Sequence, residues 1–177
     1  PQDLIYLDCN RNKLTKLPIL PQGLTTLYCR DNELTKLPTL PQDLIYLDCN
    51  RNKLTKLPTL PQDLTTLYCR DNELTKLPIL PRGLTTLYCS DNKITKLPDN
   101  VTSLIYLKEI DYSRNYINIV YHFRDDIDVY GSNQQEINHE NGEEVPLEDD
   151  FLPLEDNVAR NLIDELNDDL DNFDDLN

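Results

Sequence analysis

A 20-residue unit is repeated along residues 1–120, and this repetition limits the possible folds more than any other feature of the sequence. The unit reads L-x-x-L-x-C-x-x-N-x-L-T-K-L-P-x-L-P-x-x. Its most regular positions are Leu4, Leu24, Leu44, Leu64 and Leu84; Cys9, Cys29, Cys49, Cys69 and Cys89; and Asn12, Asn32, Asn52, Asn72 and Asn92. A unit this short cannot bury its own leucines, so its stability must come from stacking on its neighbours. The sequence therefore predicts a solenoid.

A second, 40-residue period is superimposed on the first. The segment Asp3–Pro18 recurs without change at Asp43–Pro58, and the sequence TTLYCRDNELTKLP begins at Thr25 and again at Thr65. A pair of units has thus been duplicated. The next matching unit after Leu84 follows with a 23-residue displacement and has a tyrosine at the cysteine position; its residues are Leu107, Ile110, Tyr112, Asn115 and Ile117. This longer unit is interpreted as the last of about six repeats.

Within each unit the pattern predicts a short strand followed by an extended return path. Leu7 and Cys9 alternate with polar residues, which is the period of a strand, and stacked units place such strands in a parallel sheet about 4.8 Å apart. Each repeated asparagine is expected to satisfy backbone groups where a strand ends. Pro18 and Pro21, repeated in later units, exclude a helix. The predicted fold class is an α/β-type repeat solenoid dominated by β structure, with parallel strands on the concave face and a polyproline-like convex face without helices.

These residues resemble the leucine-rich-repeat family, whose consensus is L-x-x-L-x-L-x-x-N-x-L. The 20-residue length and the L-P-x-L-P segment are most similar to the short repeats of bacterial secreted effectors of the YopM and IpaH kind. The cysteine in place of a consensus leucine is also similar to repeat arrays of giant DNA viruses. The resemblance covers residues 1–120. The helical hairpin that precedes the repeats in the effectors, and the ubiquitin-ligase domain that follows them in one group, have no counterpart in this sequence.

The five cysteines are predicted to be core residues. Their spacing contains no C-x-x-C pair and no histidine lies nearby, so neither a metal site nor any other cofactor is expected. They occupy the apolar position of the consensus, where cysteine acts as a small hydrophobe. Free thiols in register favour a reducing compartment, which predicts an intracellular location, in a host cytoplasm or a virion. The sequon at Asn100-Val101-Thr102 is the one feature that points to secretion instead.

Charge divides the chain into a balanced part and an acidic part. Residues 1–100 contain 13 basic and 11 acidic side chains, whereas residues 101–177 contain 4 basic and 21 acidic ones. Nucleic acid and membrane surfaces are therefore not expected as partners, because both attract clustered positive charge. The sequence has no apolar run of transmembrane length and does not begin with a signal peptide. It also lacks a nucleophile–histidine arrangement or a phosphate loop, so no enzyme activity is predicted.

The resemblance implies that the sheet face recognises another protein. The side chains expected there are Tyr6, Asp8, Arg11, Tyr28, Arg30, Asp31, Tyr46, Asp48, Arg51, Tyr68, Arg70, Asp71 and Tyr88. Tyrosine and arginine are enriched in interface hot spots, which favours a protein-protein interaction module. Two alternatives stay open: a structural component of a larger assembly such as a virion, and the substrate-recognition part of a ubiquitin-ligase-type enzyme. The face itself has a purely structural interpretation, in which alternating arginines and aspartates neutralise each other and tyrosines cover their neighbours.

Further predictions concern the lysine at each repeat and the two ends of the chain. The column Lys16, Lys36, Lys56, Lys76 and Lys96 is either a basic stripe for an acidic partner or a solvated edge. An uncapped first repeat would expose a sheet edge and favour a homodimer. Residues 117–131 are predicted to form a C-terminal cap and residues 132–156 an acidic linker. Residues 157–176 are predicted to form an amphipathic acidic helix that either folds back on the solenoid, with the lysine column as its docking edge, or docks into another protein. A disordered tail is the third interpretation.

Overall fold

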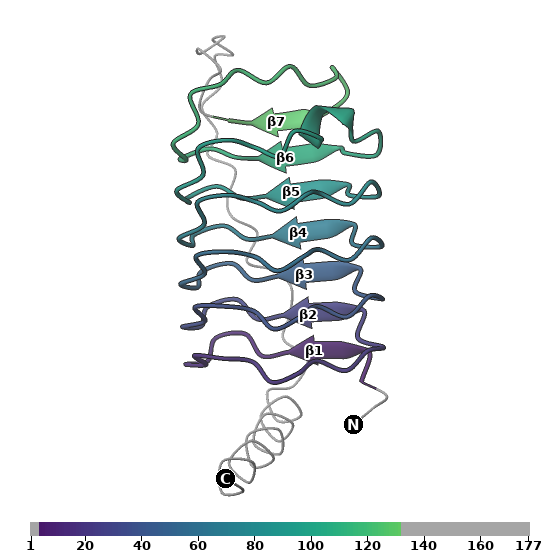
Figure 1. Cartoon of the computed structure of the whole chain (residues 1–177), viewed down its shortest axis with the longest axis vertical. Coiled ribbons are helices and arrows are strands. Elements are labelled where there is room, and N and C mark those ends of the chain that lie inside the picture. The colour runs from purple at the N-terminus through teal and green to yellow at the C-terminus, as the bar shows by residue number, and fades with distance from the viewer. Residues whose placement is uncertain (1–3, 132–177) are drawn as a thin grey trace, which may run out of the picture. The chain divides into compact units, whose positions relative to one another are not determined.

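The computed structural model describes residues 4–131, which form a stack of coils with one short strand in each coil (Figure 1). The strands are β1 (Tyr6–Asp8), β2 (Thr26–Tyr28), β3 (Tyr46–Asp48), β4 (Thr66–Tyr68), β5 (Thr86–Tyr88), β6 (Glu109–Asp111) and β7 (Asp128–Tyr130). They make one parallel sheet in the order β1-β2-β3-β4-β5-β6-β7. The predicted parallel-strand solenoid is confirmed. The linker predicted at 132–156 and the helix predicted at 157–176 lie outside the described residues.

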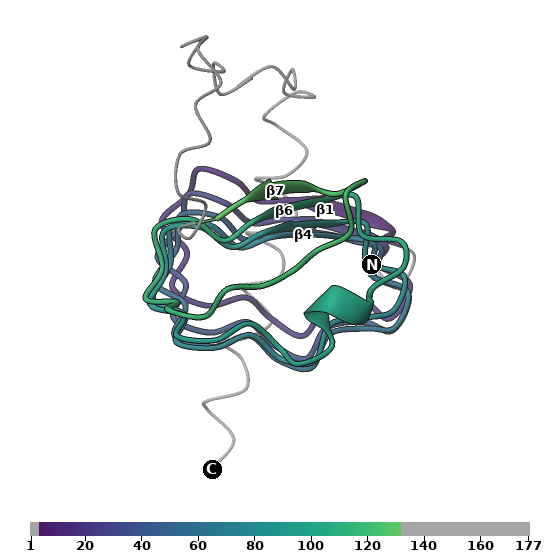
Figure 2. The ribbon, with the colours of Figure 1, turned by 90° about the horizontal axis from the view of Figure 1, so that it is seen from above.

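Seen from above, each coil runs around an interior that lies between the sheet and the return path (Figure 2). The buried apolar side chains make up the core there. Each central coil sends the same apolar positions inward, and in the second coil these are Leu24, Leu27, Cys29, Leu34, Leu37 and Leu40. Burial of a leucine side chain contributes roughly 1.5–3 kcal/mol relative to its exposure, and in a solenoid this burial depends on the neighbouring coils. The cysteines are all buried and free, as the repeat pattern predicted.

The repeated asparagine joins each coil to the preceding one by side-chain hydrogen bonds. The Asn52 Nδ2 donates to the carbonyl oxygens of Cys29 at 2.9 Å, Cys49 at 3.2 Å and Asn50 at 3.1 Å. Its Oδ1 accepts the backbone N–H of Leu34 at 3.0 Å. The same pattern recurs in other coils, at Asn32, Asn72, Asn92 and Asn115. The predicted satisfaction of backbone groups by asparagine is therefore confirmed, and it acts between coils as well as within them.

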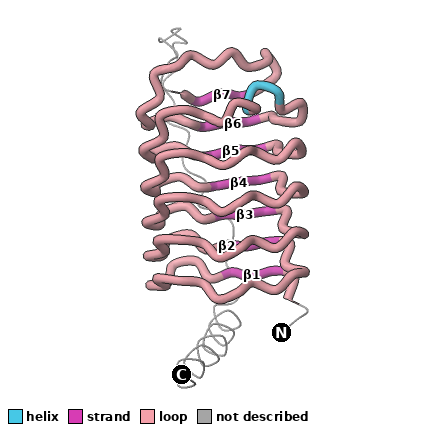
Figure 3. The backbone as a smooth tube through the Cα atoms, viewed as in Figure 1, coloured by secondary structure: helices cyan, strands magenta, loops and turns pink. Residues whose placement is uncertain are grey.

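The return path is extended, with one exception in the longest unit. Between residues 4 and 98 the chain runs through its prolines without a helix. A single 3-10 turn, η1 (Val101–Ser103), follows Pro98 (Figure 3). The 23-residue displacement of this unit supplies three more residues than the other coils have, and the turn accommodates them while Val101 enters the core. The helix-free path expected from the prolines thus changes only where the repeat itself is longer.

Residues 117–131 pack against the last full coil. Tyr121 and Phe123 lie beside the buried ring of Tyr112, with ring centroids 6.1 and 6.2 Å away. The Tyr121 hydroxyl accepts the backbone N–H of Leu97 at 2.8 Å, and the Arg124 guanidinium donates to the carbonyl of Leu104 at 2.8 Å. These contacts cover the end of the core at β6 and bring β7 into the sheet. No helix among residues 4–131 is long and apolar enough to cross a membrane.

Candidate protein-binding face

The register of the sheet sets which side chains share its outer face. Tyr6 pairs with Thr26, and Asp8 pairs with Tyr28. The first outward column is therefore Tyr6, Thr26, Tyr46, Thr66 and Thr86, and the second is Asp8, Tyr28, Asp48, Tyr68 and Tyr88. The five tyrosines predicted for the sheet face, together with Asp8 and Asp48, lie in these two columns. Because each buried leucine lies between two outward residues of its strand, the two columns run side by side along the sheet.

Five tyrosines form a continuous row across these two columns, which zigzags from Tyr6 to Tyr68 and then follows the second column to Tyr88. We call Tyr6, Tyr28, Tyr46, Tyr68 and Tyr88 the tyrosine ladder. Successive rings have centroid distances of 5.5, 4.8, 5.5 and 4.9 Å. The zigzag follows from the 40-residue period, because the tyrosine begins the strand in β1 and β3 and ends it in β2 and β4. Such ring pairs stabilise by about 0.5–1.5 kcal/mol beyond the area they bury.

The tyrosine ladder stays accessible although its rings contact each other. Tyr6 is exposed, and the other four rings are half-buried. Burial raises the pKa of Tyr6 and Tyr68, so their hydroxyls are protonated at neutral pH. The ladder thus offers flat apolar rings together with hydroxyl groups that donate hydrogen bonds, and this combination suits a partly polar protein surface.

An arginine fixes the ladder at its β5 end. The Arg70 guanidinium donates to the Asp111 carboxylate at 2.8 Å and to the Ser90 hydroxyl at 2.8 Å. It also lies 5.2 Å from the centroid of the Tyr88 ring, in a cation–π contact. The Tyr88 hydroxyl in turn donates to the Glu109 carboxylate. These contacts hold Tyr88 in one orientation, so this end of the face is preorganised.

The turn after each of β1 to β6 carries one charged residue, and the sign alternates along the stack except between Asp71 and Asp91. Its residues have a positive φ between 50 and 56°, and they are Arg11, Asp31, Arg51, Asp71, Asp91 and Arg114. The Asp31 carboxylate lies 4.0 Å from the Arg11 guanidinium, 3.6 Å from that of Arg51 and 3.1 Å from that of Arg30. Asp91 pairs with Arg114 at 2.7 Å. At these positions the column is the self-neutralising ladder of the structural interpretation, and such exposed pairs contribute at most about 1 kcal/mol each.

Asp48 is a buried carboxylate between Tyr28 and Tyr68 in the second column of the face. The residue is 5% exposed, and its Oδ1 accepts the backbone N–H of Asn50 at 3.0 Å. Burial raises the pKa of Asp48 to about 6, and the backbone hydrogen bond and the Arg30 charge oppose this rise only in part. The central tyrosines therefore surround a carboxyl group that is poorly solvated when ionised.

The structure brings the thirteen predicted site residues onto the sheet face and the turns beside it. The repeat analysis missed Glu109 and Asp111, which hold Tyr88 and Arg70. The register pairs Thr86 with Glu109, so the 23-residue displacement applied to the first column would have found this residue. Among residues 4–131, no group of three or more histidine, cysteine or acidic side chains is placed to hold a metal ion. Burial also raises the pKa of the five thiols.

Comparison with known proteins identifies the coils. Residues 62–102 match the family model described as leucine-rich repeats in two copies. The chain carries leucine-rich repeats. No curated protein matches the sequence significantly.

Solved structures place these leucine-rich repeats with those of bacterial effectors. YopM from Yersinia enterocolitica WA-314 is 38% identical with a TM-score of 0.69, over 74% of this chain and 29% of that one. A Shigella effector leucine-rich-repeat domain is 38% identical with a TM-score of 0.64, over 67% and 53%. YopM from Yersinia pestis is 33% identical with a TM-score of 0.70, over 75% and 38%. The chain thus spans about half or less of the length of these relatives.

Proposed function

We propose that this chain is a protein-recognition module and that its partner binds on the sheet face. The observation that carries the proposal is the tyrosine ladder, five adjacent rings that remain accessible along the whole length of β1 to β5. Tyrosine and arginine are the residues most enriched at interface hot spots, and Arg70 already stacks on the last ring of the ladder. Leucine-rich repeats are typical of protein-protein interaction modules, which supports the same function.

The chemistry of the described residues supports binding better than catalysis. Arg70 and Asp111 on the face are paired with each other, and the five cysteines are buried in the core. The five buried free thiols also support the inference of a reducing, intracellular location. Two other functions stay alternative predictions: a component of a virion, and the recognition part of a ubiquitin-ligase-type enzyme. The predicted homodimer and the predicted absence of nucleic-acid or membrane partners also stay predictions.

The test removes the second and fourth rings of the tyrosine ladder. Tyr28→Ala together with Tyr68→Ala interrupts the ladder twice and leaves the buried leucines of β2 and β4 in place. We expect partner capture from a lysate of the native source to fall at least about tenfold, since hot-spot truncation costs roughly 1–2 kcal/mol or more per residue. The phenylalanine pair at the same positions keeps the rings and shows how much of the loss is due to the hydroxyls.

A matched control removes two exposed tyrosines outside the ladder. Tyr106 and Tyr116 are 59% and 68% exposed, and neither belongs to a strand. Tyr106→Ala with Tyr116→Ala should leave capture unchanged. Equal capture by the ladder variant and the wild-type chain would refute the sheet face as the binding surface. An equal loss of capture in both variants would show that exposed aromatic area in general, and not the tyrosine ladder, is responsible for partner capture.

A further inference from the structure

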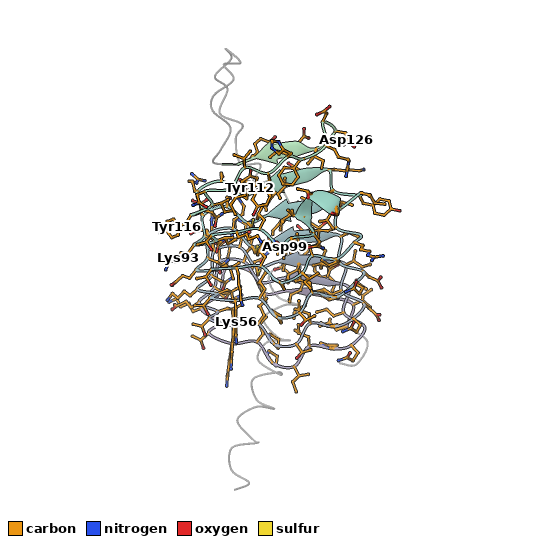
Figure 4. The ribbon with its side chains drawn as sticks, turned by 45° about the horizontal axis from the view of Figure 1, so that its top comes forward. Lys56, Lys93, Asp99, Tyr112, Tyr116 and Asp126 are labelled. Atoms are coloured by element: carbon orange, nitrogen blue, oxygen red, sulfur yellow. The ribbon has the colours of Figure 1, made fainter. Side chains whose placement is uncertain are left out.

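A second surface of the solenoid carries one lysine in every coil. We call Lys16, Lys36, Lys56, Lys76 and Lys96 the lysine column. All five side chains are exposed, and each follows an exposed threonine and precedes a leucine. Leu37, Leu57, Leu77 and Leu97 are buried, and Leu17 in the first coil is half-buried. The lysines leave the coil eight residues after the end of its strand, on the return path and not on the sheet face. Figure 4 shows Lys56 among the side chains on one flank of the stack, below Lys93.

The lysine column differs in sign pattern from the charged columns that precede it in the coil. Position 13 of the first coil begins a column of Lys13, Glu33, Lys53, Glu73 and Lys93. There Lys53 pairs with Glu33 at 2.8 Å and Lys93 with Glu73 at 3.0 Å, so adjacent coils neutralise each other. The arginine–aspartate column of the turns pairs in the same way at Asp31. Within the lysine column, each residue has only lysines above and below it. Oppositely charged pairs between adjacent coils therefore cannot form along this column.

The lysine column therefore keeps its charge. Lys96 pairs with Asp99 of its own coil at 2.5 Å. Within residues 4–131, no acidic side chain lies within 4.0 Å of the ammonium groups of Lys16, Lys36, Lys56 or Lys76. Equal charges at the spacing of the coils repel each other, and an anionic partner that spans several coils would relieve this repulsion at every step. The surface thus selects a ligand with evenly spaced negative charges.

The spacing of the lysines identifies the kind of ligand. Strands of one sheet are about 4.8 Å apart, so five lysines span about 19 Å. An α-helix rises about 5.4 Å per turn, and carboxylates at i, i+4, i+7 and i+11 lie on one face, one per turn. The mismatch of about 0.6 Å per step is small for a side chain as long and flexible as lysine. An extended peptide presents side chains on one face about every 6.8 Å and loses register after two coils.

We propose that the lysine column binds an acidic α-helix of a partner protein, which lies along the solenoid axis and places one carboxylate against each lysine. This surface is separate from the sheet face, so the proposal does not depend on the proposed function. A protein helix is favoured over a nucleic acid because the whole chain has a net charge of −15, which repels a polyphosphate far more strongly than a helix with four or five carboxylates.

The experiment titrates the full chain with labelled helical peptides and follows fluorescence anisotropy. The probe is an alanine-based peptide of about 20 residues with glutamate at i, i+4, i+7, i+11 and i+14, which puts all five carboxylates on one face. A control peptide has the same composition, with its glutamates distributed around the helix. We expect the one-faced peptide to bind at least about tenfold more tightly, with an affinity that falls as salt is added.

Two triple variants with the same charge change locate the site. Lys36→Gln, Lys56→Gln and Lys76→Gln remove the centre of the lysine column, whereas Lys13→Gln, Lys53→Gln and Lys93→Gln remove three lysines of the sign-alternating column. We expect at least a tenfold loss of affinity in the first variant and less than threefold in the second. Bound peptide should also protect Lys36, Lys56 and Lys76 from an amine-acylating reagent, read by mass spectrometry, but not Lys13 or Lys53.

Several outcomes would overturn the proposal. Equal affinity for the two peptides would show that total charge, and not helical spacing, determines binding. Equal losses in the two triple variants would exclude the lysine column as the site. Tighter binding of a single-stranded oligonucleotide than of the one-faced peptide would assign the column to a polyphosphate, and no measurable binding of the one-faced peptide would leave it a solvated edge.

Discussion

Replacement of Asn52 by alanine tests whether the asparagines hold the coils together. Asn52 lies in the third coil, with coils above and below, and its amide makes four hydrogen bonds. Two of them cross to the preceding coil, at Leu34 N and Cys29 O. Alanine retains the turn but removes both the donor and the acceptor. The expected result is a large loss of stability from a residue that contributes little apolar burial.

The size of that loss depends on which backbone groups keep a partner. The Cys49 carbonyl still accepts from Asn72 at 3.0 Å, and the Cys29 carbonyl still accepts from Asn32 at 3.2 Å. The Leu34 N–H loses its acceptor, in a residue that is fully buried. An orphaned buried donor costs about 1–3 kcal/mol, and loss of the shorter bond at Cys29 adds about 0.5–1.5 kcal/mol. We therefore expect Asn52→Ala to lower the free energy of unfolding by about 2–4 kcal/mol.

Urea denaturation followed by circular dichroism measures this change, and Asn12 provides the matched control. In the described structure Asn12 donates two hydrogen bonds, both within its own coil, to the carbonyls of Cys9 and Asn10. Asn12→Ala should cost about 1 kcal/mol, because no buried N–H of another coil loses its acceptor. A loss below about 1 kcal/mol for Asn52→Ala, or equal losses for both variants, would refute the view that the inter-coil hydrogen bonds are the stabilising ones.

Two further predictions concern Asp48 and Gly131. Burial raises the pKa of Asp48 to about 6, above the value near 3.9 of an unfolded chain, so its ionisation destabilises the fold as pH rises through this interval. Asp48→Asn should therefore raise the free energy of unfolding by on the order of 2 kcal/mol at pH 7 and leave it unchanged below about pH 4, as urea denaturation at the two pH values would show. An equal rise at both pH values would contradict the raised pKa of Asp48. A Cβ on Gly131 would overlap the Tyr112 ring, whereas one on Gly83 would meet no atom. Thermal unfolding should show Gly131→Ala destabilised by about 1–3 kcal/mol and Gly83→Ala nearly unchanged; comparable melting temperatures would show that Tyr112 moves aside without cost.

The interior of the fold is predictable from the sequence because each position there has one physical task. Leucines and cysteines at a fixed spacing must face the core, and an asparagine at the end of each strand has backbone groups to satisfy. The register follows directly, since the 20-residue repeat places Tyr6 beside Thr26 and Asp8 beside Tyr28. Both outward columns of the candidate site therefore follow from the repeat alone.

The contacts between these columns are not predictable to the same degree. Arg70 reaches Asp111, which is 41 residues away and lies beyond the unit that breaks the 20-residue period. A repeat pattern also does not determine which acceptor an arginine side chain reaches. Arg30 donates to Asp31 of its own turn, whereas the equivalent Arg70 donates to Ser90 of the next coil. Long charged side chains have many rotamers, and the choice among them depends on neighbours that the repeat does not specify.

The two periods of the chain separate what the stack requires from what the surface offers. Core leucines, cysteines and asparagines follow the 20-residue period because each coil must present the same shape to the coil above and below. Strand residues on the outer face, and charged residues that pair between coils, follow the 40-residue period, as in Tyr6 and Thr26 or in Lys13 and Glu33. Exposed charges in adjacent coils attract each other only where their signs are opposite, so a column of such charges is favourable when its sign alternates. The lysine column keeps the 20-residue period with a single sign, so pairing between coils does not account for it, whereas the proposed acidic helix would.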